Sequence, residues 1–278
     1  MIPARLPPAC SLLPLTMTQL RALIFDVDGT LAETERDGHR VAFNRAFAQV
    51  NLDWDWCVSL YQKLTEIGGG KERIRAYIQE YQPQFCPPAN FDQWVANLHQ
   101  LKTQYYRDLL ASGLIPLRPG VQRLLQEARE QGIILAIATT SAFPNATALL
   151  EYTLGPDALS WFAVIAAGDI VPAKKPAPDI YLYVLEQLQL SASECLVFED
   201  SAPGLQAALK AGLTTIITAN DYTQDQDFQG AGFVVNHLGE PDNPLTTLAG
   251  DCQNCSYLDV KTLQDFHQKC VLSKHSQS

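Results

Sequence analysis

The sequence predicts an α/β protein: a doubly wound, Rossmann-like parallel sheet that carries an inserted all-helical cap. Two observations lead to this prediction. From residue 116 onward, short apolar runs alternate with segments of helical period, a pattern typical of parallel strands joined by crossover helices. One strand-like run, 22–25, stands alone near the start, and residues 35–114 behind it show helical patterns without a convincing strand. The helical block is therefore predicted to be an insertion after the first strand.

The first strand is predicted from the stretch ALIFDVDGT, which begins at Ala22. Its four leading apolar residues are typical of a buried strand. Asp26 and Asp28 follow directly, and Gly29 opens a turn. A buried strand that ends in two acidic residues suggests that both carboxylates serve one site.

The cap is predicted from apolar residues at helical spacing. Phe43, Ala46, Phe47 and Val50 are at positions i, i+3, i+4 and i+7, which form one face of a helix. Further helical segments follow at 54–65, 71–81 and 91–112. Thr34 is a candidate N-cap for the first cap helix.

The remaining core elements alternate in type along the chain. The segment 119–132 begins with proline, ends with glycine and has an apolar helical face, so it predicts a helix. Strands are predicted at 133–138, 161–168, 195–199, 214–218 and 232–235, and helices from about 144, at 177–190 and at 202–212. We assign 35–114 to the cap, 20–34 and 115–275 to the catalytic core, and 1–19 to a disordered leader.

Composition limits the classes of partner. The chain has 278 residues and a net charge of −10 without a basic run, which argues against nucleic acid as a partner. It has no apolar stretch approaching 18 residues, so no membrane span is expected. A small anionic substrate remains compatible with an acidic protein, because a site can be locally positive. We expect a monomer that binds a small molecule.

Seven cysteines, an odd number spread over a long chain, do not form a secreted disulfide framework. A cytoplasmic location is the simplest expectation, with a plastid as the alternative if the leader is a targeting segment. Cys252, Cys255, His267 and Cys270 are all of zinc-ligand type. The segment between them has the pattern of an ordinary amphipathic helix, so ordinary core or surface cysteines are favoured over a zinc site.

Polar residues follow several of the predicted strands. In open parallel sheets, ligands bind at the carboxyl ends of the strands, so these residues should meet at one edge. They are Asp26 and Asp28, Thr139, Thr140 and Ser141, Lys174 and Lys175, and Glu199 and Asp200. Acidic groups that converge at one edge repel each other unless a cation is present, and an all-oxygen ligand set favours Mg²⁺. The alternative is that these residues only form turns and caps at strand ends. That alternative does not account for polar residues at the ends of four predicted strands.

These residue types fit phosphoryl transfer. Asp26 suits a nucleophile that forms an aspartyl-phosphate, and Asp28 suits an acid/base that protonates the leaving oxygen and then deprotonates water. Thr139 can donate to a phosphoryl oxygen, and Lys175 can balance the negative charge. Thr140 and Ser141 are candidate substrate contacts beside them.

The motifs FDVDGT, Thr139 after an apolar strand, KKPAPDIY and VFEDSAPGLQAALKAG resemble the four motifs of the haloacid dehalogenase-like hydrolase superfamily. The resemblance implies Asp26 as nucleophile, Asp28 as acid/base and a Mg²⁺ ion. It also implies that Asp26 and Asp200 bind the metal by their side chains and Asp28 by its carbonyl, with Glu199 as a further candidate ligand. The second aspartate is characteristic of phosphate-transferring members, which argues against carbon–halogen cleavage.

Two cap segments are candidates for substrate selection. Glu33, Glu35 and His39 follow the catalytic turn closely enough to face the substrate. The segment GGGKERI places glycines before a helix whose first turns contain two cations, an arrangement better suited to binding an anion than to stabilising the helix. Its candidate substrate contacts are Gly69, Gly70, Lys71 and Arg73.

These cap segments, together with Trp54 and Trp56, resemble CbbY-type phosphatases, which are similar to β-phosphoglucomutases. The resemblance implies xylulose 1,5-bisphosphate as substrate and xylulose 5-phosphate as product. Two alternatives remain open. A sugar phosphomutase would use the same core motifs, and a non-catalytic binding protein on the same fold would be expected to lack the nucleophile or the metal ligands.

Overall fold

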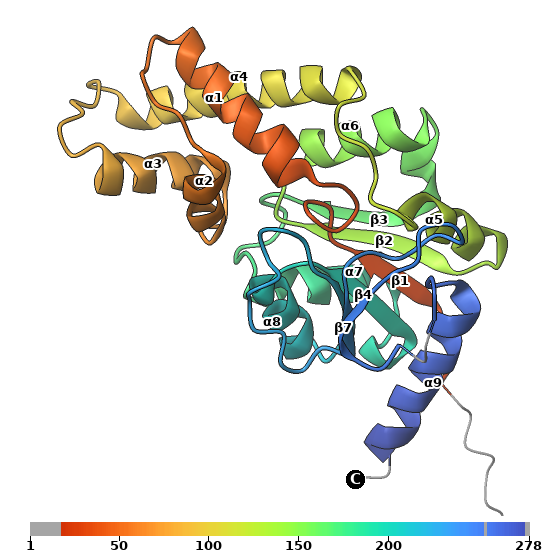
Figure 1. Cartoon of the computed structure of the whole chain (residues 1–278). Helices are drawn as coiled ribbons and strands as arrows, with labels where there is room; N and C mark the ends of the chain where they lie inside the picture. The colour runs from red at the N-terminus through yellow and green to blue at the C-terminus, as the bar shows by residue number, and fades with distance from the viewer. Residues whose placement is uncertain (1–17, 253–254, 276–278) are drawn as a thin grey trace, which may run out of the picture.

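A computed structural model of the chain describes residues 18–252 and 255–275 (Figure 1). The predicted leader lies outside the described residues up to position 17. Within them, a sheet flanked by helices forms the core, and a group of helices projects from one end of the sheet. The predicted α/β core and the helical cap region are thereby confirmed.

The sheet has seven strands in the order β3-β2-β1-β4-β5-β6-β7. Six are parallel, as predicted, and β7 pairs antiparallel with β6. The strands are β1 (Ala22–Phe25), β2 (Ile134–Thr139), β3 (Phe162–Ala167), β4 (Cys195–Glu199), β5 (Thr214–Thr218), β6 (Phe233–Val235) and β7 (Thr247–Gly250). β7 was not predicted from the sequence, because its four residues are all exposed and form no apolar run.

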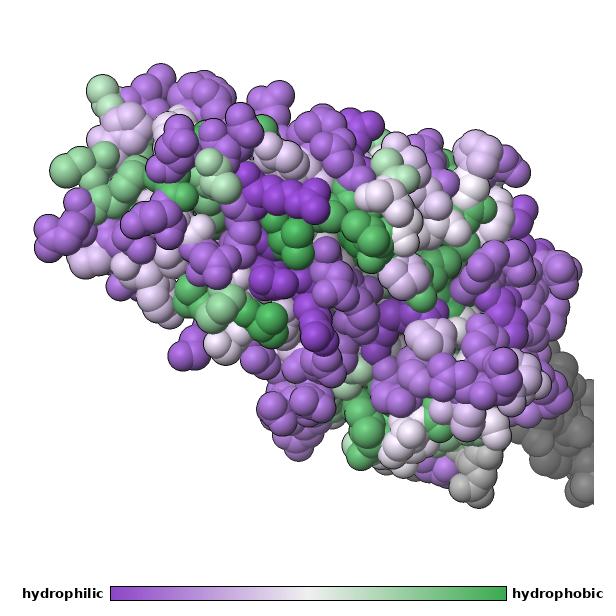
Figure 2. Space-filling model, turned by 45° about the horizontal axis from the view of Figure 1, so that its top comes forward, coloured by the Kyte–Doolittle hydropathy of each residue, from purple (hydrophilic) through white to green (hydrophobic). Residues whose placement is uncertain are grey.

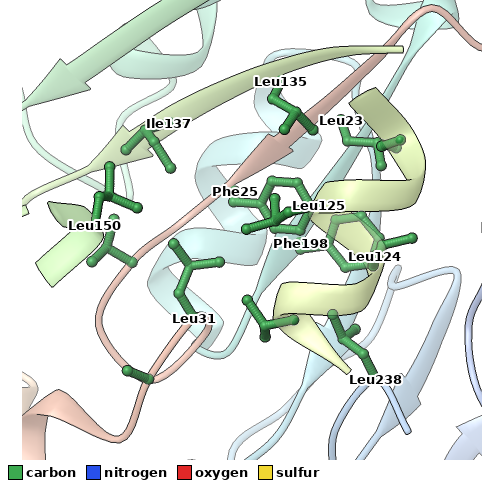
Figure 3. Packing of buried hydrophobic residues seen from close by; sticks show 14 of the residues in the cluster. Leu23, Phe25, Leu31, Leu124, Leu125, Leu135, Ile137, Leu150, Phe198 and Leu238 are labelled. Carbon is green, nitrogen blue, oxygen red and sulfur yellow. The ribbon is translucent and has the colours of Figure 1, made fainter. Parts of the chain in front are cut away.

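Two layers of helices cover the sheet, one on each face. One cluster packs α5 (Val121–Glu130), α6 (Phe143–Leu154) and α9 (Val260–His275) on one face, and a second packs α7 (Asp179–Leu188) and α8 (Ala202–Lys210) on the other. Figure 3 shows the first of these interfaces, with Phe25 of β1 and Phe198 of β4 beside Leu125 of α5. The Phe25 and Phe198 rings stack with centroids 4.6 Å apart. Such a densely packed layer makes the strand ends a rigid base for chemistry.

The cap consists of a turn of π-helix, η1 (Glu35–His39), followed by four helices. These are α1 (Arg40–Gln49), α2 (Val58–Thr65), α3 (Gly70–Tyr81) and α4 (Phe91–Ala111). The helix predicted at 54–65 exists but begins later, at Val58, because Trp54 and Trp56 precede α2 and insert their rings into the cap's aromatic cluster. Val50 is the C-cap residue after α1, is 39% exposed and does not complete the predicted apolar face.

On the face shown in Figure 2, hydrophobic residues form separate patches among hydrophilic ones. Across the described ranges, 18–252 and 255–275, none of the helices combines the length and apolar character needed to cross a bilayer.

Candidate active site

The strand register explains why acidic residues meet at one edge of the sheet. Phe25 is paired with Phe198 in the parallel β1–β4 ladder, so the residues that follow them, Asp26 and Glu199, are neighbours. The strand order reverses between β1 and β4, and ligands of open α/β sheets bind at such a switch point. Ligand oxygens of Asp26, Glu199 and Asp200 lie within 4.8 Å of one another, and all three residues are buried.

Two glycines permit this close approach. Gly29 has φ of 81°, a conformation that glycine adopts without strain, and a Cβ there would strike the carboxylate of Asp200. A Cβ on Gly204 would strike the carboxylate of Glu199. The glycines in DGT and APGL therefore let the turn after β1 and the start of α8 pack directly against acidic side chains.

Lys175 lies between two of these carboxylates. Its Nζ donates to Asp26 Oδ1 at 2.7 Å, to Glu199 Oε1 at 2.5 Å and to the carbonyl of Ala138 at 2.8 Å. Tyr181 donates to the same Glu199 oxygen at 2.6 Å. Glu199 is fully buried and serves here to hold Lys175 against Asp26.

The electrostatics favour a bound cation. Burial raises the pKa of both Asp26 and Asp200, and the neighbouring carboxylates raise it further. Lys175 lowers the pKa of Asp26 and Arg118 lowers that of Asp200, but both pKa values remain above their usual range. A divalent ion between the carboxylates would relieve this repulsion. The donor set is all oxygen, as Mg²⁺ prefers, so the residues present fit this metal.

Asp28 faces the same site, but its side chain contacts a different set of residues. Thr34 donates to its Oδ1 at 2.5 Å, and His39 Nε2 lies 3.0 Å from the same atom. Thr34 is the N-cap residue of η1, as predicted, but its hydroxyl makes no capping bond to the helix backbone. Burial acts to raise the pKa of Asp28, but His39 and Thr34 outweigh it, and the pKa lies below its usual range. The carboxylate is thus held in its ionised form.

Lys102 of α4, which was not predicted from the sequence, supports this arrangement. Its Nζ lies 2.8 Å from Nδ1 of His39, which joins Lys102, His39 and Asp28 in one line of contacts. Burial lowers the pKa of Lys102 to about 8, although Glu35 and Asp28 act to raise it. One signal was available: Leu98, Lys102 and Tyr106 recur every four residues, so the lysine lies in the buried stripe of an amphipathic helix.

Two adjoining cavities lie between the cap and the core. The first, of about 410 Å³, is lined by Asp26, Asp200, Thr139 and Lys175. The second, of about 380 Å³, is lined from the cap by Gly69, Gly70, Lys71 and His99 and from the core by Ser141 and Lys174, and we call it the cap pocket. Asp28, Glu35, Arg73 and Thr140 line both cavities. All the predicted site residues except Glu199 thus border one or both of them.

The two predicted cap cations have different surroundings. Both terminal nitrogens of Arg73 contact the carboxylate of Glu35, at 3.1–3.2 Å, and Tyr61 donates to the same carboxylate. Lys71 has no ion-pair partner within the parts of the chain that the structure describes, and it lines the cap pocket. Lys71 is therefore the cation available to an incoming anion, whereas Arg73 and Glu35 brace each other.

Asn220 and Arg118 are further residues that the sequence analysis missed. Asn220 Nδ2 donates to Asp200 Oδ2 at 2.7 Å. The buried Arg118 guanidinium donates to the carbonyls of Gly29, Thr218, Ala219 and Asn236, and its Nε lies 3.0 Å from Glu33. Glu33 therefore pairs with Arg118, in the segment that joins α4 to α5, although it also lines the first cavity. Asn220 comes shortly after β5, so the rule that ligands bind at strand ends could have identified it. The same rule could not identify the role of Arg118, because its partners come from distant segments.

The four zinc-type residues near the C-terminus do not form a metal cluster. Among residues 18–252 and 255–275, the acidic trio at the sheet edge is the one set of three His, Cys, Asp or Glu side chains close enough to share an ion. Nε2 of His267 instead lies 2.7 Å from the carbonyl of Ser193. Cys252 is buried, and Cys255 is partly buried.

Comparison with known proteins agrees with this site. The family model of haloacid dehalogenase-like hydrolases matches residues 20–212. The chain therefore belongs to the haloacid dehalogenase-like hydrolase family, and it is a phosphatase of that family.

Within the family, the chain is similar to CbbY proteins. It is 46% identical to protein CbbY of Cupriavidus necator over 81% of this chain and 89% of the relative, and 41% identical to a CBBY-like protein of Arabidopsis thaliana over 86% and 76%. A mutant CbbY from Rhodobacter sphaeroides, solved with xylulose 1,5-bisphosphate, matches with a TM-score of 0.73 and 43% identity, over 78% of this chain and 94% of that one. A β-phosphoglucomutase from Clostridium difficile shares the fold at 19% identity, with a TM-score of 0.68 over 91% of this chain and 99% of that one.

Proposed function

We propose that the protein is a Mg²⁺-dependent phosphatase that hydrolyses xylulose 1,5-bisphosphate to xylulose 5-phosphate and phosphate. One observation carries the proposal: a phosphoryl-transfer constellation lies in one cavity, and a second cavity with an unpaired cation adjoins it. A substrate with two phosphates would fill both. The complex of the similar CbbY protein with this bisphosphate supports the choice of sugar.

In the first step we expect an Asp26 oxygen to attack phosphorus as the bond from phosphorus to the sugar oxygen breaks. Lys175 contacts Asp26 directly, so it orients the nucleophile and offsets the negative charge that builds up. Bound to Asp26 and Asp200, with the Asp28 carbonyl, Mg²⁺ would supply charge stabilisation at the transferring group. Thr139 borders the same cavity and can donate its hydroxyl proton to a phosphoryl oxygen.

Asp28 transfers one proton in each of the two steps. It gives a proton to the departing sugar oxygen and then takes one from the water that attacks phosphorus, which breaks the bond to Asp26 and releases phosphate. In the structure the carboxylate is held ionised by Thr34 and His39, as the second step requires. The negative charge of an incoming phosphate disfavours that ionised form, so substrate binding should raise the pKa of Asp28 and prepare it for the first step.

The second phosphate is expected to bind in the cap pocket near Lys71. We predict that Lys71→Ala raises KM for xylulose 1,5-bisphosphate by about tenfold, the effect of losing one charge-assisted contact. KM for a sugar monophosphate should change little, because it leaves the cap pocket without an anion. Steady-state kinetics on both substrates provide the measurement.

Arg75 provides a matched control on the same helix, because its side chain pairs with Asp92 at the surface and lines neither cavity. Arg75→Ala should leave both KM values at wild-type levels. An equal rise in KM for the two substrates in Lys71→Ala would show that the cap pocket does not bind a second phosphate.

The proposed substrate is tested by measuring phosphate release with Mg²⁺ from xylulose 1,5-bisphosphate, ribulose 1,5-bisphosphate and β-glucose 1-phosphate. We expect fast release from the xylulose compound and little from the ribulose compound. Conversion of glucose 1-phosphate to glucose 6-phosphate without phosphate release would identify a mutase instead.

A further inference from the structure

The loop after β5, residues 219–227, connects the core to the cap. Its Tyr222 is buried in the cap's hydrophobic cluster, whose other buried members all belong to the cap. The rings of Tyr222 and Tyr61 meet edge to face, with centroids 6.4 Å apart. Gln62 Nε2 donates to the carbonyl of Tyr222 at 3.2 Å. A core side chain is thus packed into the part of the cap that carries α2.

The same loop contacts the candidate metal ligand Asp200 through Asn220. Asn220 uses both ends of its side-chain amide: Oδ1 accepts from the N–H of Tyr222 at 2.9 Å, and Nδ2 donates to Asp200 Oδ2 at 2.7 Å. The turn is fastened by Thr223, whose hydroxyl accepts from the N–H of Asn220 at 3.1 Å. A short series of contacts therefore runs from the cap cluster to Asp200.

We propose that Asn220 and Tyr222 are positioning residues that make the orientation of Asp200 depend on the position of the cap. Groups that hydrogen-bond a metal ligand fix its orientation and tune metal affinity. If the cap moves away, the Tyr222 ring loses its packing, the loop loses an anchor and the Asn220 amide is no longer held against Asp200. Docking of the cap would thereby complete the metal site at the moment that the cavity closes. This inference rests on the proposed role of Asp200 as a Mg²⁺ ligand.

The contacts of Tyr222 indicate which part of its side chain matters. Its hydroxyl oxygen is buried and has no hydrogen-bond partner among the residues that the structure places. A buried hydroxyl without a partner does not stabilise this arrangement, so the packing of the ring must hold Tyr222 in the cap. The neighbouring pair of Asp221 and Arg36 is exposed and contributes little. A phenylalanine at position 222 should therefore preserve the coupling.

The test is the Mg²⁺ dissociation constant measured by isothermal titration calorimetry without substrate. We expect Tyr222→Ala to weaken Mg²⁺ binding by about tenfold, the lower end of the effect of losing a group that supports a metal ligand. Tyr222→Phe should bind Mg²⁺ like the wild type. Tyr77→Ala is the matched control, because Tyr77 belongs to the same cluster and its ring meets those of Trp54, Trp56 and Tyr81, which all lie in the cap. It should lower Tm without changing Mg²⁺ affinity.

A double-mutant cycle tests the route through Asn220. Asn220→Ala should weaken Mg²⁺ binding by itself, and Tyr222→Ala should add nothing in its presence, because both changes break the same series of contacts. Tyr222→Leu replaces Tyr222→Ala throughout if the alanine variant does not fold, since it keeps apolar volume and removes the ring contact with Tyr61.

The outcomes separate this inference from the proposed function. Wild-type protein that binds no Mg²⁺ would contradict both. Wild-type binding with equal affinity in Tyr222→Ala or Tyr222→Leu would overturn the coupling and leave the proposed phosphatase intact. A loss of affinity in Tyr77→Ala as large as that in Tyr222→Ala would also overturn it, because general loosening of the cap would then explain the effect.

Discussion

Asp26→Asn is expected to lower phosphate release by at least about 10⁴-fold, because the amide cannot attack phosphorus or form the acyl phosphate. The substitution keeps the shape of the side chain, and Lys175 can still donate to the remaining oxygen. It also removes one of the charges that raise the pKa of Asp200 in this buried cluster. We therefore expect Tm to stay the same or rise while turnover is lost, as measured by thermal denaturation beside the phosphate assay.

This combination of results separates chemistry from folding. A variant that is inactive because it is misfolded would show a lower Tm and a changed circular dichroism spectrum. A well-folded Asp26→Asn protein with a turnover near that of the wild type would show that Asp26 is not the nucleophile.

Lys175→Met is expected to cause the second large effect, on stability as well as activity. It leaves Asp26 and Glu199 buried without their shared cation, and breaking a buried pair in this way costs about 3–5 kcal/mol. The stranded carboxylates should take up protons, so the native state binds protons that the unfolded chain has released. Stability should therefore fall as pH rises above the ordinary carboxylate range, and the deficit should be larger near pH 8 than near pH 5.

The neighbouring lysine provides the control. Lys174 is half-buried and pairs at 3.1 Å with Asp169, whose side chain is 76% exposed. Lys174→Met should change the free energy of unfolding by no more than about 0.5 kcal/mol at either pH, as is usual for surface substitutions. Denaturant unfolding at both pH values compares the two variants, and equal losses in both would contradict the role given to Lys175.

The sheet and its polar edge were predictable because they depend on local patterns. Apolar runs predicted six of the seven strands of the described sheet, and the rule that ligands meet at strand ends predicted one shared site for Asp26, Thr139, Lys175 and Asp200. β7 was not predicted because its pairing with β6, rather than its own composition, makes it a strand.

The supporting contacts were less predictable, because they join residues far apart in the chain. Lys102 meets His39 across 63 positions, and Arg118 reaches carbonyls as many as 118 positions away. The sequence suggested that Arg73 binds a substrate anion, and only the fold shows its pairing with Glu35. The sequence alone does not show which of two cations is paired, because pairing depends on which side chains the folded cap brings into contact.

The most direct test of the central claim is to trap the phosphorylated enzyme. The wild type is mixed with excess xylulose 1,5-bisphosphate and Mg²⁺, quenched in acid within a single turnover, digested and analysed by mass spectrometry. Our account predicts one added phosphoryl group on the peptide that contains Asp26, and none in Asp26→Asn. Rapid phosphate release without any phosphorylated peptide, or with the group on another residue, would contradict it.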